Sequence, residues 1–215
     1  MSHLLRVALP DVPGSLGRVA TAIGLAGGNI EAIEIVEHRA DGVAVDDVFL
    51  SMTDGVMPDS VVSACTQLDG VEVIWIQRYG AGGGLFLDLE LVEEMTQQHK
   101  DARNVLVDAL PSTFRVDWAA RLRPEVGGIG VVRRTPAAPE EIPDDIPWPQ
   151  VITRGMRLDV PEPWSDVIAA GCPLGHDGDL VVIARRGGPA ILDSEIARLS
   201  HLCALADSIA GASDA

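Results

Sequence analysis

Apolar and polar positions in residues 1–79 follow strand and helix periods in turn. The run 4–9 is apolar, strand-sized and ended by Pro10, which predicts a strand. A helix is predicted next, and Gly27-Gly28 is a typical stop signal for it. Its apolar positions recur at intervals of three and four residues: Leu16, Val19, Ala20 and Ile23.

The remainder of this segment predicts the rest of a sheet. Residues 29–37 and 43–53 have strand patterns, and Asp41-Gly42 between them is typical of a hairpin turn. A helix over 58–68 and a strand over 71–79 follow. The order is therefore β-α-β-β-α-β, the ferredoxin-like arrangement in which two helices cover one face of a four-stranded antiparallel sheet.

A glycine-rich stretch follows at residues 80–84, where four of the five positions are glycine. Glycine places few steric limits on the backbone, so this composition predicts a flexible linker. We therefore expect two domains, with residues 1–79 before the linker and residues 85–211 after it.

Beyond the linker, the pattern predicts helices around a second sheet. A long helix is expected over 87–110 and ended by Pro111, followed by a shorter helical stretch over 116–122 and a strand over 129–133. The segment 135–149 holds five prolines and four acidic residues, so it is expected to form an exposed loop.

The end of the chain predicts a hairpin and a helix. Strands over 166–173 and 180–186 flank His176-Asp177-Gly178-Asp179, which has the composition of a turn. The final helix is expected to be capped by Asp193. Helices at both ends of a sheet predict an α/β or α+β second domain, and the whole chain is expected to be α+β in fold class.

The composition is that of a packed globular protein, with 47% hydrophobic and 22% charged residues. No apolar run approaches the roughly 20 residues of a membrane helix. The N-terminus lacks the pattern of a signal peptide, so a cytoplasmic location is expected. Cys65, Cys172 and Cys203 are odd in number and widely spaced, which argues against a disulfide framework or structural zinc and predicts buried thiols.

The formal net charge is −16, and Lys100 is the only lysine. A chain this acidic repels polyanions, because nucleic-acid binding depends on neutralising phosphates. DNA, RNA and anionic membranes are therefore not expected as partners. A small zwitterion or another protein remains compatible with this charge.

A turn motif precedes the first helix, in the segment Asp11-Val12-Pro13-Gly14-Ser15-Leu16, and Gly27-Gly28-Asn29-Ile30 follows at the end of that helix. Together these segments resemble the signature of the ACT domain, a small regulatory module that binds an amino acid. The resemblance covers residues 1–79 and agrees with the β-α-β-β-α-β order of the same residues.

The residues of this motif suit an amino-acid ligand. The turn places free backbone N–H groups at a helix start, where the helix dipole favours a carboxylate. Asp11 offers a carboxylate to an α-ammonium group, and Asn29 offers both a donor and an acceptor. The resemblance implies a site where the first loop of one subunit meets the second strand of a neighbour. Its expected residues are Asp11, Val12, Pro13, Gly14, Ser15, Leu16, Asn29 and Ile30.

A purely structural role for these residues stays open. Asp11 can cap the helix, Pro13-Gly14 can serve only as a turn, and Asn29 can adopt the left-handed conformation after two glycines. Unpaired sheet edges favour self-association. The resemblance to ACT domains also implies a homodimer formed through the sheet.

Residues 85–211 resemble, more loosely, a GAF domain, another fold that senses small molecules. The likeness rests on segment 126–132, on the hairpin 170–182, and on 185–199 leading into a helix. No chromophore cysteine or cyclic-nucleotide motif carries over, so the likeness implies no pocket residues.

No catalytic set stands out in the sequence. It lacks a nucleophile elbow, a zinc-protease motif, a P-loop and a Rossmann glycine string, so no catalytic residue, cofactor or metal is predicted. His176, Asp177 and Asp179 have side chains that bind metals, but their crowding into one turn is more typical of a solvated hairpin. Cys172 would need a nearby base to act as a nucleophile, and the sequence places none there.

The sequence thus favours an amino-acid-binding sensor over an enzyme. Ligand binding to the ACT domain would signal to the GAF-like domain or to a separate effector protein. Two alternatives stay open. Residues 85–211 could be an unrecognised enzyme of amino-acid metabolism under ACT control, or the protein could be a ligand-free dimerisation scaffold.

Overall fold

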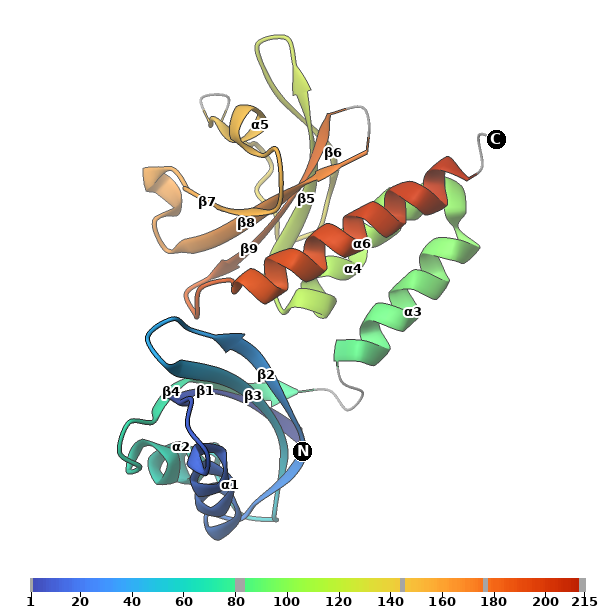
Figure 1. The fold of residues 1–215 in the computed structure, drawn as a ribbon. Coiled ribbons are helices and arrows are strands. Elements are labelled where there is room, and N and C mark those ends of the chain that lie inside the picture. Colours follow the sequence, from blue (N-terminus) through green and yellow to red (C-terminus); the bar gives the residue numbers. More distant parts are fainter. Residues whose placement is uncertain (1, 80–83, 144–145, 176–177, 213–215) are drawn as a thin grey trace. The chain divides into compact units, whose positions relative to one another are not determined.

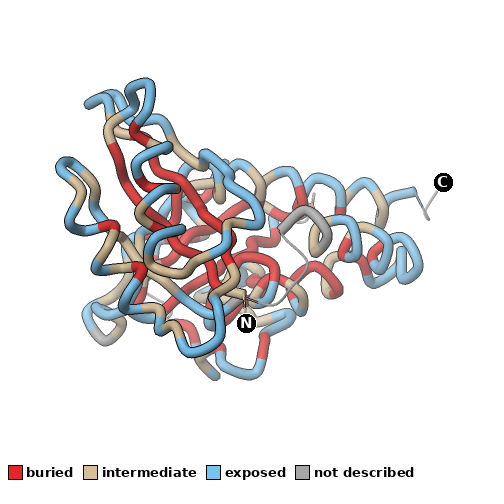
Figure 2. Tube along the Cα trace, turned by 90° about the horizontal axis from the view of Figure 1, so that it is seen from below, coloured by how far each residue is buried: buried red, intermediate tan, exposed pale blue. Residues whose placement is uncertain are grey.

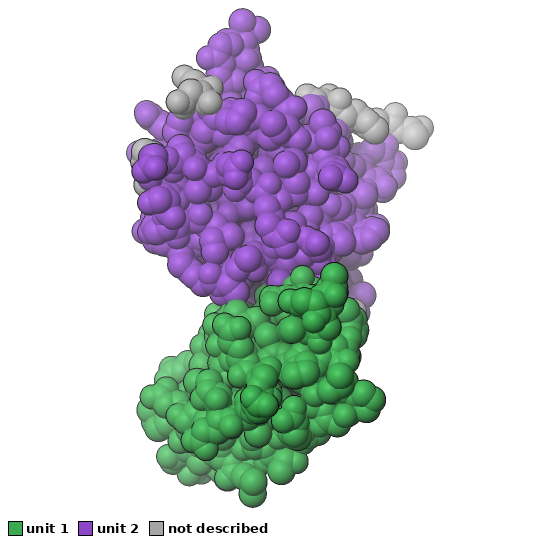
Figure 3. Space-filling model, turned by 60° about the vertical axis from the view of Figure 1, so that its left-hand side comes forward, with its two compact units in different colours: residues 1–81 green, residues 82–215 purple. Residues whose placement is uncertain are grey.

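The computed structural model describes residues 2–79, 84–143, 146–175 and 178–212. The chain divides into two compact units, residues 1–81 (unit 1) and residues 82–215 (unit 2), which Figure 3 colours separately. Each unit has its own sheet and its own clusters of buried apolar side chains. The glycine-rich linker predicted at 80–84 falls largely outside the described residues, and Gly84 begins a helix.

Unit 1 has the β-α-β-β-α-β order that the sequence predicts, and this prediction is confirmed. Its described elements are β1 (Ser2–Pro10), α1 (Ser15–Leu25), β2 (Gly28–His38), β3 (Val43–Met52), α2 (Pro58–Thr66) and β4 (Glu72–Tyr79). These strands form an antiparallel sheet in the order β2-β3-β1-β4. Both helices lie on the same face of it (Figure 1).

The core of unit 1 lies between this sheet and the two helices. Alternate residues of β1 and β3 and positions about one turn apart on α1 form it: Leu5, Val7, Val48, Leu50, Val19 and Ile23. Strand side chains alternate between faces, and helix side chains repeat every three or four residues, so the periods in the sequence place these residues together. Figure 2 shows buried positions along the strands and exposed positions in the connecting loops.

Two glycines fix the ends of α1. Gly14 precedes the helix with a φ of 92°, and Gly27 follows it with a φ of 88°. Both values lie in the left-handed region, where a residue that has a side chain is strained. At Gly27, an added Cβ would also lie 2.7 Å from a side-chain carbon of Val56.

Unit 2 contains a second antiparallel sheet with its longer helices on one face. Its described helices are α3 (Gly84–Gln97), α4 (Ala102–Phe114), α5 (Trp148–Val151) and α6 (Asp193–Gly211), with short 3-10 turns at His99–Asp101 and Glu162–Trp164. Its described strands are β5 (Trp118–Glu125), β6 (Gly128–Arg134), β7 (Met156–Leu158), β8 (Val167–Leu174) and β9 (Asp179–Arg186). The strand order is β6-β5-β9-β8-β7.

The two faces of this sheet bury different clusters. Helices α4 and α6 pack against one face, where Val181 and Ile183 of β9 contribute, and α3 packs on these two helices (Figure 1). The other face is covered by the segment between β6 and β8. Trp164 there has its ring centroid 6.0 Å from that of Trp118 and 5.9 Å from that of Trp148. The expected α+β fold class is confirmed.

The long helix predicted over 87–110 is wrong, because α3 and α4 are separate helices. The chain leaves helical geometry at Gln98, with φ −111° and ψ 46°, and passes through a 3-10 turn before α4 begins. Pro111 does not end the helix but lies inside α4, which continues to Phe114. Arg115, with a φ of 52°, ends it instead.

The helical stretch predicted over 116–122 is also wrong, because these residues lead into β5. Trp118, Ala120 and Leu122 belong to one buried cluster and Ala119 to the other. A strand buried on both faces has a continuous apolar run, so its two-residue period is hidden.

The segment 135–149 was expected to be an exposed loop, and this is wrong for its apolar residues. Ala138, Ile142, Ile146 and Trp148 are buried against the sheet of unit 2. Prolines fix an irregular backbone there but do not keep the side chains between them in water.

The last hairpin strands and the final helix lie where the sequence predicts them, as β8, β9 and α6. Leu192 rather than Asp193 holds the cap position of α6, and its N–H donates to Glu195 Oε2 at 2.8 Å. The turn residues His176 and Asp177 lie outside the described residues. In the part of the chain that the structure describes, no helix is both long and apolar enough to cross a membrane.

Candidate functional site

The loop from Asp11 to Gly14 joins β1 to α1 at one end of the first sheet. The Asp11 N–H donates to the carbonyl of Gly42 at 2.8 Å, and the Val12 N–H donates to the carbonyl of Pro10 at 2.9 Å. These bonds fix the loop against the β2–β3 turn, while its own residues stay exposed. The loop is therefore both ordered and accessible to a ligand.

The amides of the first turn of α1 are only partly free. The Ser15 N–H donates to the carbonyl of Val12 at 3.2 Å. The N–H groups of Leu16 and Gly17 have no acceptor among the described residues. Of the predicted donor set, the amides of Asp11, Val12 and Ser15 are thus occupied by the chain itself. The Gly14 N–H likewise has no acceptor among the described residues, so the available donors are the amides of Gly14, Leu16 and Gly17.

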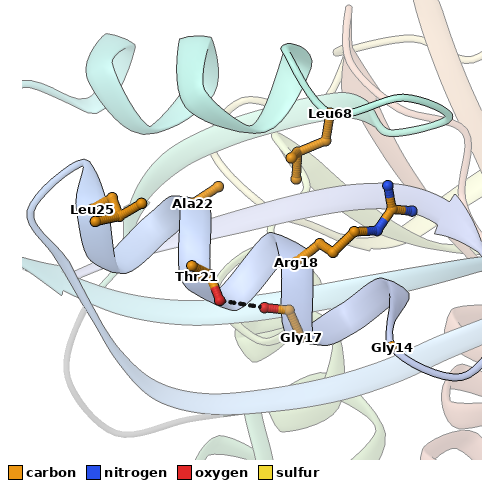
Figure 4. A pocket seen from close by; sticks show the side chains of 7 residues that line it. All are labelled: Gly14, Gly17, Arg18, Thr21, Ala22, Leu25 and Leu68. Carbon is orange, nitrogen blue, oxygen red and sulfur yellow. Dashed lines mark hydrogen bonds between the residues drawn. The ribbon is translucent and has the colours of Figure 1, made fainter.

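An open hollow of about 400 Å³ adjoins these free amides (Figure 4). Residues of α1 and one residue after α2 line it: Gly14, Gly17, Arg18, Thr21, Ala22, Leu25 and Leu68. Figure 4 shows Leu68 pointing from the end of α2 toward α1, with the Arg18 guanidinium beside it. The hollow therefore combines a mostly apolar lining with one cation, next to the start of α1. The sequence motif did not indicate Arg18 or Leu68.

Two residues of neighbouring strands complete this end of the sheet. The His38 Nδ1 of β2 lies 2.8 Å from the Asp11 Oδ2. Asp46 of β3 is only 1% exposed, and its Oδ1 has no hydrogen-bond partner among the described residues. Burial raises the pKa of the Asp46 carboxyl, His38 opposes this rise, and the charges of Asp11 and Asp47 add to it. The pKa of this carboxyl is therefore higher than that of a solvated aspartate.

Sequence reasoning missed His38 and Asp46, because neither belongs to the turn motif. His38 is 27 residues from Asp11, and only strand pairing brings the two together. Asp46 did carry a signal, since two adjacent carboxylates interrupt the apolar run of β3.

Asp47, the neighbour of Asp46, makes a buried ion pair on the opposite face of the sheet. The Arg6 Nε donates to Asp47 Oδ1 at 2.6 Å and its Nη2 donates to Oδ2 at 2.9 Å. The guanidinium carbon of Arg6 also lies 5.4 Å from the centre of the Trp75 ring. This arrangement joins β1, β3 and β4, so the role of Asp47 is structural.

Within one chain, Asn29 lies far from the loop. Asn29, the second residue of β2, pairs with Ser51, whereas His38 at the other end of β2 pairs with Ala44. The seven residue steps from Ala44 to Ser51 along β3 correspond to about 23 Å at roughly 3.3 Å per residue. Ile30 packs against the core of unit 1. The chain therefore brings Asp11 to Leu16 together but not Asn29 and Ile30.

In unit 2, the possible metal ligand Asp179 is instead paired with two arginines. Asp179 accepts hydrogen bonds at 2.6 Å from Arg121 and from Arg123. Burial raises the pKa of Asp179, but these hydrogen bonds outweigh it and the pKa lies below its ordinary value. Among the residues that the structure describes, no three His, Cys, Asp or Glu side chains are grouped to hold a metal ion.

The family model of the ACT domain matches residues 3–67. Unit 1 therefore contains an ACT domain, and this class of domain together with the exposed loop indicates a regulatory, ligand-binding role. A stretch of 37 residues is 57% identical to NAD-dependent malic enzyme 1 of Bacillus subtilis. It covers 17% of this chain and 8% of that enzyme, so the chain spans only a small part of this relative.

Two solved structures similar to this chain are GAF domains. One is the GAF domain of the Acinetobacter phosphoenolpyruvate-protein phosphotransferase, with a TM-score of 0.43 and 11% identity over 60% of this chain and 95% of that one. The other is from Pseudomonas syringae pv. tomato, with a TM-score of 0.45 and 16% identity over 61% of this chain and 87% of that one. At these TM-scores the likeness carries no argument about ligand or activity.

Proposed function

We propose that the protein is an amino-acid-binding regulatory protein of the cytoplasm. In this proposal, unit 1 forms a homodimer through its sheet, and the ligand lies where two copies meet. The observation that supports this proposal is the position of Asn29, which lies at the opposite end of β2 from the exposed loop. A second copy brings the two ends together.

The strand β2 has the features of a dimer interface. It lies at an edge of the sheet, where its outer N–H and C=O groups face away from β3. Ile33 and Ile35 are exposed on it, and the side chain of Ile35 is 51% exposed. An exposed apolar edge strand favours pairing with another strand, and a two-fold axis makes that pairing self-complementary.

Antiparallel pairing of two β2 strands brings the separated residues together. If the whole of Gly28–His38 pairs with its copy, the two-fold axis passes Ile33 and residue 29 faces residue 37 of the other copy. Asn29 of one copy then adjoins the His38–Asp11 corner of the other. The arrangement makes two equivalent sites in each dimer.

The chemistry of this corner suits a zwitterion. The free amides of Leu16 and Gly17 and the positive end of the α1 dipole favour a carboxylate. The carboxylate of Asp11 favours an ammonium group. A ligand that contacts both copies stabilises the dimer, and its binding energy would bias the GAF-like residues 85–211 or a separate effector protein.

A thermal-shift screen of the twenty amino acids on the full chain tests the ligand. A ligand at a hundred times its Kd stabilises the folded state by about 2.7 kcal/mol. Asn29→Ala should lose most of that stabilisation. The matched control is Ser51→Ala, because Ser51 Oγ is the partner of the Asn29 amide at 3.5 Å and its loss leaves Asn29 in place.

A lysine on the edge strand tests the interface. Ile35→Lys should produce monomers in light scattering and lose the amino-acid shift with them, since buried like charges oppose pairing. Val151→Lys in unit 2, at a position 42% exposed, should change neither property. A dimer that persists without any amino-acid shift would favour a scaffold, and turnover of amino-acid derivatives would favour an enzyme.

A further inference from the structure

Two cysteines of unit 2 meet where α6 packs on β8. Cys172 lies on β8 and Cys203 on α6, and they are 3% and 2% exposed. Both cysteines belong to the same buried cluster, and each thiol shifts the pKa of the other. The Ser200 Oγ, one turn before Cys203 on α6, lies 3.5 Å from the Cys172 sulfur, so this part of α6 lies directly on β8.

The two thiols have different acidities. The hydrogen bond from Cys203 lowers the pKa of Cys172 to about 7, in spite of its burial. The same hydrogen bond raises the pKa of Cys203 well above its ordinary value. At neutral pH, Cys172 is thus partly a thiolate, the reactive form, and Cys203 is the adjacent thiol that can resolve an oxidised Cys172.

The carboxylate of Asp207, which acts on both thiols, is paired with a guanidinium group. Asp207, one turn beyond Cys203, disfavours a thiolate on either cysteine. Arg103 of α4 binds its carboxylate, with Nε 2.7 Å from Oδ1. Cys65 of unit 1 offers a comparison, because burial raises its pKa and unit 1 has no second cysteine.

We propose that Cys172 and Cys203 form a reversible disulfide that ties α6 to β8 when the protein meets a peroxide. The Cys172 thiolate attacks one peroxide oxygen, the O–O bond breaks, and the leaving hydroxide takes a proton to become water. Cys203 then loses its proton and attacks the Cys172 sulfenic acid, so that an S–S bond forms, the S–O bond breaks and a second water leaves. The two sulfurs together lose two electrons, which reduce the peroxide.

This site is independent of the amino-acid site of unit 1. The bond would join the C-terminal helix of unit 2 covalently to its sheet, and a dithiol would release it. Loss of the amino-acid response would therefore leave the disulfide unaffected, and the reverse also holds.

Peptide mapping of the full chain tests the proposal directly. The chain is treated with hydrogen peroxide, free thiols are blocked with N-ethylmaleimide, and trypsin is added. The lysine and arginine positions place Cys65, Cys172 and Cys203 in the separate peptides 40–78, 158–185 and 199–215. The expected product is a linked pair of the last two peptides, two hydrogens lighter than their sum. Dithiothreitol should separate the pair, and the peptide 40–78 should carry the maleimide.

Three outcomes would overturn the proposal. Both cysteines could remain open to the maleimide after peroxide, Cys172 could stop at the sulfinic acid with Cys203 still a thiol, or the link could join two chains. Cys203→Ser should give sulfenic and sulfinic forms of Cys172, while the control Cys65→Ser should retain the full yield of the linked peptides. The wild-type map decides the question even if Cys203→Ser fails to fold.

Discussion

Asp46 and Asp47 are neighbours in β3, yet strand alternation puts them on opposite faces of the sheet with different surroundings. Asp47 has a bidentate partner in Arg6. Asp46 is buried, and no hydrogen bond from the described residues reaches its Oδ1. A buried carboxylate oxygen that accepts no hydrogen bond disfavours the charged form of the group in the folded state.

Asp46→Asn should therefore stabilise unit 1 at neutral pH. Burial raises the pKa of Asp46 in the folded state above its value in the unfolded chain. The stability that protonated Asp46 contributes is thus fully present below about pH 4, and it is lost as the pH rises through the pKa of Asp46 in the folded state. The neutral variant should gain about 1 kcal/mol at pH 7 and little at pH 4.

Urea unfolding of the full chain at both pH values measures this difference. Asp54→Asn, at an exposed position of the same unit, is the control and should change the free energy of unfolding little at either pH. If Asp46→Asn is less stable than the wild type at pH 7, the charged carboxylate of Asp46 stabilises the folded state, and the prediction is wrong.

Cys172 gives a second residue-scale prediction, in the rate of its reaction with hydrogen peroxide. With a pKa of about 7, the thiolate fraction rises roughly tenfold between pH 6 and pH 8 and then levels off. Stopped-flow or quenched samples, analysed by the loss of maleimide-reactive Cys172, should follow this curve. A rate that keeps climbing beyond pH 8, as for Cys65, would contradict the acidity of Cys172.

At the scale of elements, the contact of Arg6 with Asp47 and Trp75 joins β1, β3 and β4 on one face of the sheet. Arg6→Met should cost about 3–5 kcal/mol, because it leaves the Asp47 carboxylate buried and unpaired. Arg6→Met with Asp47→Leu should recover most of that loss. Chemical unfolding of the two variants distinguishes the cases, and equal losses in both would mean that the contact with Trp75 matters more than the charge.

Most of the elements of unit 1 could be predicted because their signals are local. Strand alternation, the helical period and the glycines at 14 and 27 all act within a few residues. β5 could not be predicted as a strand, since burial on both faces removes the alternation. The break between α3 and α4 was missed for another reason. Apolar positions on both sides fit one continuous stripe, and only packing separates the two helices.

The candidate site was predictable only in part, because some of its residues are brought together by long-range pairing and packing. The loop 11–16 is a contiguous motif with its own turn chemistry, and the sequence shows it. His38 and Asp46 reach the loop through strand pairing, and Leu68 faces α1 through helix packing. Such contacts depend on register and topology, which one sequence does not reveal. The occupied amides of Asp11, Val12 and Ser15 likewise follow from the folded loop.

At the scale of the whole molecule, the net charge of −16 opposes the proposed dimer. Glu31, Glu34 and Glu37 lie on β2, and pairing brings the two sets close together. Raising the salt concentration from about 0.01 M to about 1 M shortens the screening length from roughly 30 Å to roughly 3 Å. The dimer should therefore become several-fold tighter.

Sedimentation velocity over a dilution series at both salt concentrations measures this change. A dimer that weakens with salt would mean that ion pairs hold the interface, and the apolar edge at Ile33 and Ile35 would then be the wrong surface.

The tryptophans of unit 2 make the two units optically distinct. The ring of Trp164 is within contact distance of two other indoles: its centroid lies 6.0 Å from that of Trp118, at an interplanar angle of 76°, and 5.9 Å from that of Trp148, at 48°. Indoles this close share their excited states, which produces paired circular-dichroism bands of opposite sign that vanish when the rings separate. Trp75 is the only indole of unit 1. The melting of unit 2 can therefore be followed by its own spectral signature in the intact chain.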